Sequence, residues 1–304
     1  MPSIRSQLAA LALAGLPGGS APAYEATGLE LTPEEQHAFA AMRALWSSLD
    51  RRTGLIPLRD GILTLYVPDD FYFIDAEDTE RVLVEAWGNP PGQDTLGMLF
   101  PAGVTPFDED AWAVTLEYDE DGHVSDADAA HIDYWKLLSE MRADIHTANP
   151  HRIDAGYPPI ELVGWVEPPH YDACTRKLYW AKELRFGDAA NNSLSYEVLA
   201  LGRTGVLSMT FIADTTQLAA INARRDRVLA MVEFSPGKRY DDFDASTDEV
   251  ALYGIGTLIA GEVVSKSSVV ASALAMLKKL GASIVEALVA VAHQTKRILA
   301  GSAR

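Results

Sequence analysis

Short runs of mostly apolar residues recur along the chain between residues that are typical of turns. One of them is Ile62–Val67, which lies between Gly61 and Pro68. Apolar and β-branched residues bounded by turn residues are typical of strands. Strands are predicted at residues 62–67, 96–101, 111–118, 160–166, 177–184, 194–201 and 206–213.

Four other segments carry apolar residues at the spacing of three and four that is typical of helices. Pro33 stands at the first turn of one of them, where a missing N–H costs nothing. Asp75 is placed to cap the second, and Ser125 with Asp128 forms a capping box that predicts the start of the third. Helices are predicted over about 33–49, 76–87 and 218–232, and after Ser125 along Ile132, Trp135, Leu138 and Met141.

Strands mixed with helices in this order predict an α+β fold with a mostly antiparallel sheet and flanking helices. The predicted body is an acidic α+β domain over residues 55–245. A helical segment over 24–54 precedes it, and a helical, apolar and basic tail over 246–304 follows it.

The first 23 residues have the features of an export signal. Arg5 supplies a positive start, Leu8–Leu16 a short apolar core, and Ala21-Pro22-Ala23 the small residues that a signal peptidase reads. Nine apolar residues are too few to span a hydrocarbon core, which needs about 20. We therefore predict a signal peptide over residues 1–23.

The net charge of the chain restricts the classes of molecule that it can bind. The chain has 43 Asp and Glu against 25 Lys and Arg, a net charge of −18. Residues 24–264 are more acidic still, with 42 acidic and 18 basic residues, whereas residues 265–304 carry a net charge of +5. A body of this charge repels phosphate backbones, so nucleic acid is excluded as a partner, and cations, basic peptides or a basic protein are favoured.

The tail predicts an association with a membrane. Leu280–Ala292 is apolar except for Ser283 and Glu286, but no window reaches 18 uninterrupted apolar residues. An interfacial helix, a span that buries Glu286 against a partner, and a helix docked on the body all remain open. On a helix one stripe would be polar, and it contains Lys279, Ser283, Glu286, Ala290, His293 and Arg297.

Several runs of uncommon residues occur in a fixed order. They are Trp87–Pro91, Gly164-Trp165, Pro168–Asp172, Leu178–Leu184, Leu201–Arg203, Arg239–Phe243 and Tyr253-Gly254. With these runs, residues 55–262 resemble the bacterial family of uncharacterised membrane-anchored proteins that carry domain of unknown function 2167. The resemblance implies an exported protein held by a C-terminal hydrophobic segment, and it carries over no catalytic residue.

The order of strands and the late helix is also similar to the small sandwich domains of the PsbP and Mog1 type. That similarity concerns the fold alone. Together with the export signal, the family resemblance predicts a protein of the inner membrane whose acidic domain faces the periplasm. A soluble periplasmic protein with a docked C-terminal helix is the alternative.

The densest group of polar and aromatic residues spans 168–183. Two interpretations remain open: a pocket mouth in which His170 titrates near neutral pH, or a rigid hairpin whose aromatic side chains pack and whose charges pair. Arg203 beside a predicted turn, and Tyr240 with Asp242, extend this group. The candidate binding patch is His170, Tyr171, Asp172, Trp180, Lys182, Glu183, Arg203, Tyr240 and Asp242.

Two hypotheses for function follow. The first is a non-catalytic binding or assembly protein of the bacterial envelope, with a protein partner. The second is a hydrolase or transferase that uses His170 with Asp172 or Glu183. The sequence predicts no cofactor and no metal site, since the single Cys174 cannot form a thiolate cage and the acidic run from Asp119 lacks the EF-hand spacing.

Overall fold

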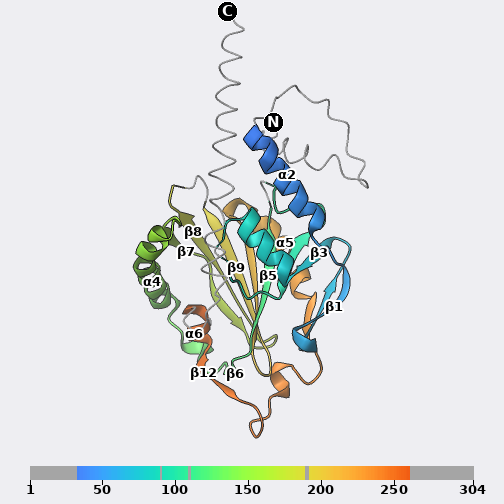
Figure 1. Cartoon of the computed structure of the whole chain (residues 1–304). Helices are drawn as coiled ribbons and strands as arrows, with labels where there is room; N and C mark the ends of the chain where they lie inside the picture. Colours follow the sequence, from blue (N-terminus) through green and yellow to red (C-terminus); the bar gives the residue numbers. More distant parts are fainter. Residues whose placement is uncertain (1–32, 90, 109–110, 189–191, 261–304) are drawn as a thin grey trace, which may run out of the picture.

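The computed structural model describes residues 33–89, 91–108, 111–188 and 192–260 (Figure 1). Its centre is a seven-stranded sheet in the order β3-β4-β5-β10-β9-β8-β7, and every neighbouring pair is antiparallel. This confirms the predicted α+β class. The strands are β3 Phe71–Asp75, β4 Gly97–Pro101, β5 Ala113–Asp119, β7 Ile160–Asp172, β8 Lys177–Phe186, β9 Ser193–Leu201 and β10 Val206–Asp214.

The sequence pattern predicts six of these strands and misses β3, whose five residues follow Pro68 without a clear alternation. It also ends β7 too early, because the strand continues through Pro168 and Pro169 to Asp172. Proline is tolerated there because β7 is an edge strand, where the missing N–H leaves no neighbour without a donor.

Two smaller sheets complete the β-structure. β2 (Leu63–Val67) pairs with β1 (Gly54–Leu58) and with β11 (Val232–Phe234), both antiparallel. At the lower end in Figure 1, β6 (His123–Ser125) and β12 (Val250–Gly254) pair in parallel. The first of these sheets forms a second layer on the large sheet.

That layer closes the main core. Side chains such as Leu65 from the small sheet pack with Tyr196 and Phe211 from the large one. Helix α5 (Leu218–Leu229) adds Ile221 and Val228, both fully buried. Each such side chain contributes about 1.5–3 kcal/mol by its removal from water, so this apolar face specifies how the layers stack.

The opposite face of the large sheet carries helices at both sides (Figure 1). Helix α4 (Tyr134–Asp154) lies against β7, and α3 (Ala76–Arg81), which continues as a π-helical turn over Val82–Ala86, lies against β3 and β4. The short helix α6 (Ile255–Ala260) contacts α4.

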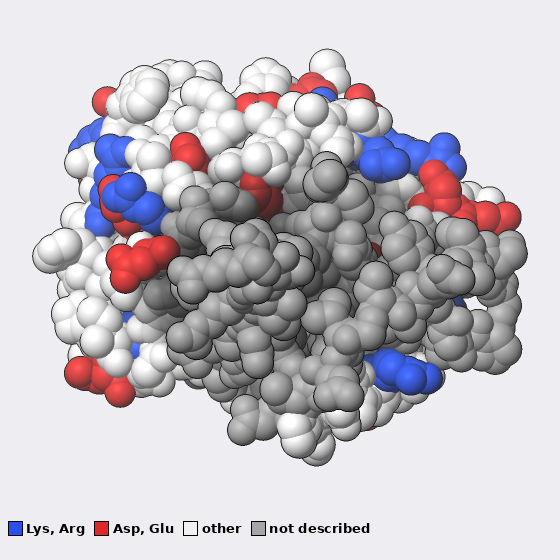
Figure 2. Space-filling model, turned by 90° about the horizontal axis from the view of Figure 1, so that it is seen from above, with Lys and Arg blue, Asp and Glu red and all other residues white. Residues whose placement is uncertain are grey.

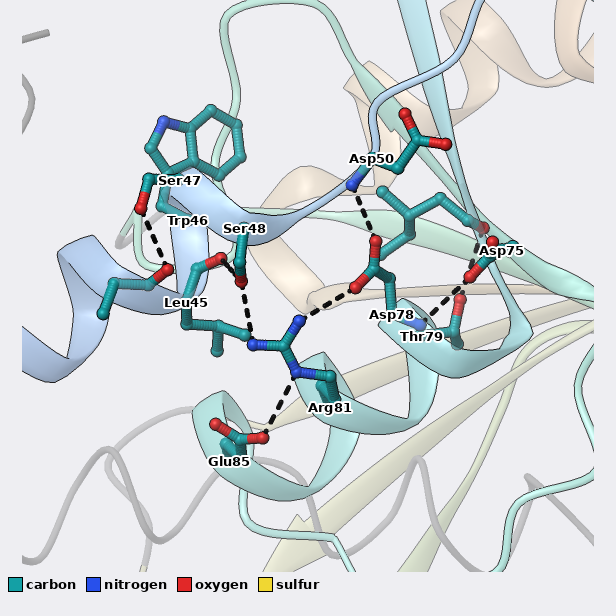
Figure 3. Close-up of polar contacts among 12 residues, drawn as sticks. Leu45, Trp46, Ser47, Ser48, Asp50, Asp75, Asp78, Thr79, Arg81 and Glu85 are labelled. Carbon is teal, nitrogen blue, oxygen red and sulfur yellow. Dashed lines mark hydrogen bonds and ion pairs between the residues drawn. The ribbon is translucent and has the colours of Figure 1, made fainter.

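Helix α2 (Pro33–Ser48) is fixed to α3 by polar contacts around Arg81 (Figure 3). Arg81 donates hydrogen bonds to Asp78 at 3.0 Å and to Ser48 at 2.8 Å. The Asp78 carboxylate also accepts from the backbone N–H of Asp50 at 2.7 Å. The predicted helix within residues 24–54 is therefore part of the folded body, and the structure describes it over Pro33–Ser48.

The predicted capping box at Ser125 and Asp128 is wrong. Helix α4 begins at Tyr134, and Asp133 caps it by accepting from the backbone N–H groups of Trp135 and Lys136 at 3.1 and 3.0 Å. The Asp128 carboxylate instead accepts from the N–H groups of Ile255 and Gly256, at 3.1 and 3.0 Å. A side-chain cap can serve a helix that is distant in sequence, and the local pattern does not reveal which one.

Replacing Asp128 by Ala should release the start of α6. Two backbone N–H groups lose their acceptor, so we expect the free energy of unfolding to fall by about 1–2 kcal/mol and amide exchange at Ile255 and Gly256 to accelerate. Urea unfolding and hydrogen exchange measure both effects. Asp144→Ala, on the exposed side of α4, is the control and should change stability by less than about 0.5 kcal/mol.

The structure extends the body to Ala260, inside the region that the sequence assigns to the tail over 246–304. Ile255 and Ile259 are buried and pack with Leu137 and Leu138 of α4. The signal peptide and the remainder of the tail lie outside the described residues. Among the helices that the structure describes, none combines the length and the apolar character needed to cross a membrane.

Candidate functional site

The β7–β8 hairpin places the central residues of the candidate patch. His170 lies opposite Tyr179 and is exposed, and Asp172 lies opposite Lys177 where the turn begins. The Asp172 carboxylate accepts from the Thr175 hydroxyl at 2.8 Å and from the Cys174 N–H at 2.9 Å. These hydrogen bonds, and to a lesser extent the nearby His170, lower the pKa of Asp172. Asp172 is thus engaged in closing the turn.

The remaining hairpin residues lie on two faces of the sheet, as strand alternation requires. Trp180 is 2% exposed and packs in the core beneath α4, so its ring is buried rather than offered to a ligand at a pocket mouth. Lys182 shares that buried face. Glu183 points to the other face and accepts from the Asn192 amide at 2.7 Å. Asp172 and Glu183, the two carboxylates proposed as partners of His170, thus accept hydrogen bonds from other groups. The hydrolase or transferase hypothesis stays a prediction.

Tyr171 and Tyr240 instead meet at the lower end of the large sheet. Tyr171 donates its hydroxyl to Asp126 at 2.7 Å, and Arg176 donates to the same carboxylate oxygen at 2.7 Å. Arg176 also bonds Asp241 at 3.1 Å, and its guanidinium lies 4.6 Å from the centre of the Tyr240 ring. We call Asp126, Tyr171, Arg176, Tyr240 and His123 the aromatic–acidic cluster.

His123 completes this cluster from strand β6. Its ring lies 4.3 Å from the Tyr240 ring and stacks on Phe243 at 3.9 Å between centroids. Burial lowers the pKa of His123, so the imidazole is held neutral between the two aromatic rings. The Tyr240 hydroxyl donates to the carbonyl of Val124 at 3.2 Å, which ties the loop after β11 to β6.

Arg203 and Asp242 stabilise the same loop. The Arg203 guanidinium makes two hydrogen bonds to Asp248, at 2.7 and 2.9 Å, and this pairing strongly lowers the pKa of Asp248. Asp242 accepts from the backbone N–H of Arg239 at 2.9 Å and is exposed. The structure therefore brings Tyr171, Arg203, Tyr240 and Asp242 to one end of the molecule and separates them from Trp180 and Lys182.

The loop fixed in this way presents strand β12 at the surface. Val250 is 55% exposed and Leu252 is fully exposed, while Ala251 between them is buried. Of the strands that the structure describes, β12 pairs only with β6, so its other edge has no strand beside it. Exposed Asp241, Asp242, Asp244 and Glu249 precede it in the chain.

A second group of polar residues lies buried across the centre of the large sheet. Strand register places Trp180, Glu197, Thr210 and Thr115 in one row on β8, β9, β10 and β5, on the face that carries α3 and α4. Residues that lie opposite one another on neighbouring strands point to the same face of the sheet. Residues two positions further along each strand point to that face as well, so the neighbouring rows lie on it too. We call the buried polar residues of these rows the polar band: Thr115, Glu117, Lys182, Ser193, Ser195, Glu197 and Thr210.

An ion pair lies in the polar band. The Lys182 ammonium is 2.8 Å from Glu197, the Ser195 hydroxyl donates to the same carboxylate oxygen at 2.8 Å, and both charged side chains are at most 5% exposed. Burial, with the nearby carboxylates Asp119, Glu197 and Asp94, raises the pKa of Glu117 to about 9. Glu117 is therefore a neutral acid at pH 7.

The sequence analysis singles out Lys182 but misses Glu117 and Glu197. A signal for both exists, because Thr115 and Glu117, and likewise Ser195 and Glu197, occupy alternate positions within otherwise apolar strands. Such a strand has one polar face. Among the described residues, no group of three or more His, Cys, Asp or Glu side chains could hold a metal ion.

Comparison with known families identifies the chain. The family described as "Protein of unknown function (DUF2167)" matches residues 50–289, about four-fifths of the sequence. The chain belongs to this family. The match confirms the family resemblance seen in the sequence motifs, and it extends past Ala260, where the described structure ends.

No curated protein matches the sequence significantly. Among solved structures, the DUF2167 chain is similar to cyanobacterial PsbP from Synechocystis, with 10% identity and a TM-score of 0.34, over 62% of this chain and 93% of that one. It is also similar to the Ran-binding protein Mog1p of Saccharomyces cerevisiae, with 11% identity and a TM-score of 0.26, over 62% and 96% of the two chains.

Proposed function

We propose that this protein is a non-catalytic binding protein of the bacterial envelope that captures a basic partner segment on β12 and the acidic loop before it. The observation that carries the proposal is the full exposure of Leu252 on a strand that, among the described residues, has a neighbouring strand at one edge only. Exposed apolar side chains on an edge strand favour the addition of a strand from a partner.

Three side-chain contacts support this proposal by holding the binding edge in one conformation. Tyr240, Arg203 and Asp128 each fix a different point of the chain between residues 235 and 256. A binding edge that is already ordered loses little conformational entropy when a partner docks.

The acidic residues that precede β12 support a basic partner. The exposed carboxylates of Asp241, Asp242, Asp244 and Glu249 lie close in sequence to Val250 and Leu252. Viewed from the opposite end, the described surface carries basic as well as acidic side chains (Figure 2). A basic segment would be attracted to the acidic edge, and alternate apolar residues in it would cover Val250 and Leu252.

A synthetic peptide of alternating Lys and Val, labelled for fluorescence anisotropy, tests this proposal. We expect it to bind the full chain in a salt-sensitive manner and Leu252→Ser to weaken binding about tenfold, which corresponds to about 1.4 kcal/mol. Ile153→Ser is the matched control, because Ile153 is 54% exposed on α4 and should not affect binding. Equal affinities for the three proteins would contradict the proposal.

The proposed place of action is the periplasmic side of the inner membrane. It is supported by the export-signal pattern of residues 1–23 and by the apolar run Leu280–Ala292 with its basic flanks. The soluble periplasmic protein is the alternative outcome of the test that follows.

Fractionation with an alkaline wash distinguishes the two. The full chain should stay with the membrane, and Ile284→Lys with Leu288→Lys, on the apolar side of the predicted tail helix, should release it. Ser283→Lys with Ala290→Lys places the same two charges on the polar stripe and should leave it bound. Release of all three proteins would favour the soluble alternative.

A further inference from the structure

His123 is a titratable side chain buried against the loop that leads into β12. It is 8% exposed, and the rings of Tyr240 and Phe243 lie against its imidazole. Its Nδ1 is 3.3 Å from the carbonyl oxygen of Arg203. Because a carbonyl can only accept, this hydrogen bond requires the hydrogen on Nδ1 and leaves Nε2 as the atom that a further proton would join. Burial also raises the pKa of Tyr240, so both rings against the imidazole are uncharged.

Charged groups from several segments face the His123 ring. Asp126 follows β6 and Asp248 precedes β12, and both carboxylates favour a charged imidazole. Arg176, in the turn between β7 and β8, opposes it. Each carboxylate already has a cation of its own, since Asp126 accepts from Arg176 and Asp248 accepts from Arg203, both at 2.7 Å. Burial is therefore the larger effect, and the pKa of His123 lies below its ordinary value of 6.5.

The same residue joins β6 to the binding edge. The backbone N–H of His123 donates to the carbonyl of Glu249 at 2.8 Å, and His123 lies opposite Val250 in the pair of β6 with β12. Residues 238–249, which we call the 238–249 loop, supply both rings that cover the imidazole. A movement of this loop away from His123 would disturb the first contacts of β12.

We propose that protonation of His123 releases the 238–249 loop from β6 and thereby weakens the capture of a partner segment on β12. An imidazolium covered by two rings loses part of its hydration, and release of the loop returns that hydration. A binding edge that is less ordered loses more conformational entropy when a partner docks. The link to partner binding rests on the proposed function, whereas the release of the loop does not.

Acid favours the released loop because His123 binds protons more tightly in that state. The packed ring has a pKa below 6.5, and the released ring titrates near 6.5. Release is therefore suppressed above about pH 7 and grows as the pH falls below 6.5, by at most about tenfold for each pH unit. Glu117 stays protonated throughout this range, because its pKa is about 9.

Hydrogen exchange of the full chain without a partner tests the release of the loop. Two amides join the body to the loop: the N–H of His123, bonded to Glu249, and the N–H of Arg203, bonded to the carbonyl of Lys238 at 3.0 Å. We expect the protection factors of both amides to fall by up to about tenfold between about pH 7.5 and 5.5. An NMR titration of the His123 Cε1–H should give a pKa below 6.5.

His123→Phe keeps a flat ring that takes no proton, so its protection factors should not change over this range. His146→Phe, on the exposed side of α4, is the matched control and should keep the wild-type pH dependence. Phe243→Leu retains His123 but removes one covering ring. It should raise the pKa of His123 toward 6.5 and reduce the pH dependence.

The Lys–Val peptide then tests the link to binding. The affinity of the wild type should fall several-fold from about pH 7.5 to 5.5, and the affinity of His123→Phe should not. Release of the loop in acid with an unchanged wild-type affinity would overturn this link. An absence of peptide binding at about pH 7.5 would contradict the proposed function instead, and the exchange result would stand by itself.

Two results would overturn the release of the loop. The first is a set of wild-type protection factors that does not change with pH, or that falls equally in His123→Phe. The second is a set that rises in acid together with a His123 pKa above 6.5. That result would mean that attraction of the imidazolium to Tyr240 and Phe243 exceeds its loss of hydration.

Discussion

Replacing Glu117 by Gln is expected to stabilise the protein at neutral and alkaline pH and to leave it unchanged near pH 4.5. The folded state holds a proton on Glu117 up to about pH 9, whereas the unfolded state releases it near the ordinary value of 4.5. Between these values the folded state binds more protons, so the wild-type free energy of unfolding falls as pH rises.

The expected gain follows from that difference. Each pH unit in this window is worth about 1.4 kcal/mol, so the variant should be more stable by up to about 3 kcal/mol at pH 7 and by more at pH 8. Gln has the shape of the protonated acid and needs no proton. Urea unfolding of both proteins at several pH values gives the comparison.

Glu233→Gln is the matched control for this experiment, because Glu233 lies on β11 with its side chain exposed. The free energy of unfolding of this variant should differ little from that of the wild type at every pH. A gain for Glu117→Gln that does not change with pH would show that the carboxyl is ionised in the folded protein.

The second large effect is expected at the buried ion pair. Lys182→Met leaves the Glu197 carboxylate without its cation at a site where water does not reach either side chain. Breaking a buried pair from one side costs about 3–5 kcal/mol, because the remaining charge is uncompensated. We expect a loss of this size in urea unfolding at pH 7.

The double variant Lys182→Met with Glu197→Gln should recover most of that loss, since no isolated charge remains. The comparison for an exposed pair is Lys136→Met, whose partner Glu140 lies 3.5 Å away on the surface of α4. Its loss should stay below about 1 kcal/mol. Equal losses for the two Lys→Met variants would mean that water reaches Lys182 in the native state.

Short-range features account for what was predictable in the fold. The strand of Ile160–Val166 and the helix over Pro33–Ser48 were predictable because periodicity depends on neighbouring residues. The start of α4 was predicted too early because Ser125 and Asp133 are both residue types that cap helices. In the structure Asp133 caps α4, whereas Asp128, the other member of the predicted box, accepts from the backbone of α6.

The candidate site was predicted as one patch and is divided in the structure. Trp180 and Tyr171 belong to the same hairpin, but strand alternation sends Trp180 into the core, and Tyr171 pairs with Asp126, 45 residues away in the chain. Contacts over such separations depend on how the strands are ordered in the sheet, and no local pattern contains that order.

The sequence alone determined the family, the α+β class, the positions of most strands and the strong negative charge of the body, because all of these are properties of composition and of neighbouring residues. Only the tertiary structure decided that Glu117, Lys182 and Glu197 would meet in one buried band and that Leu252 would stand exposed on an edge strand. Register between distant strands sets which side chains share a face and which remain in water, and burial then determines their charge.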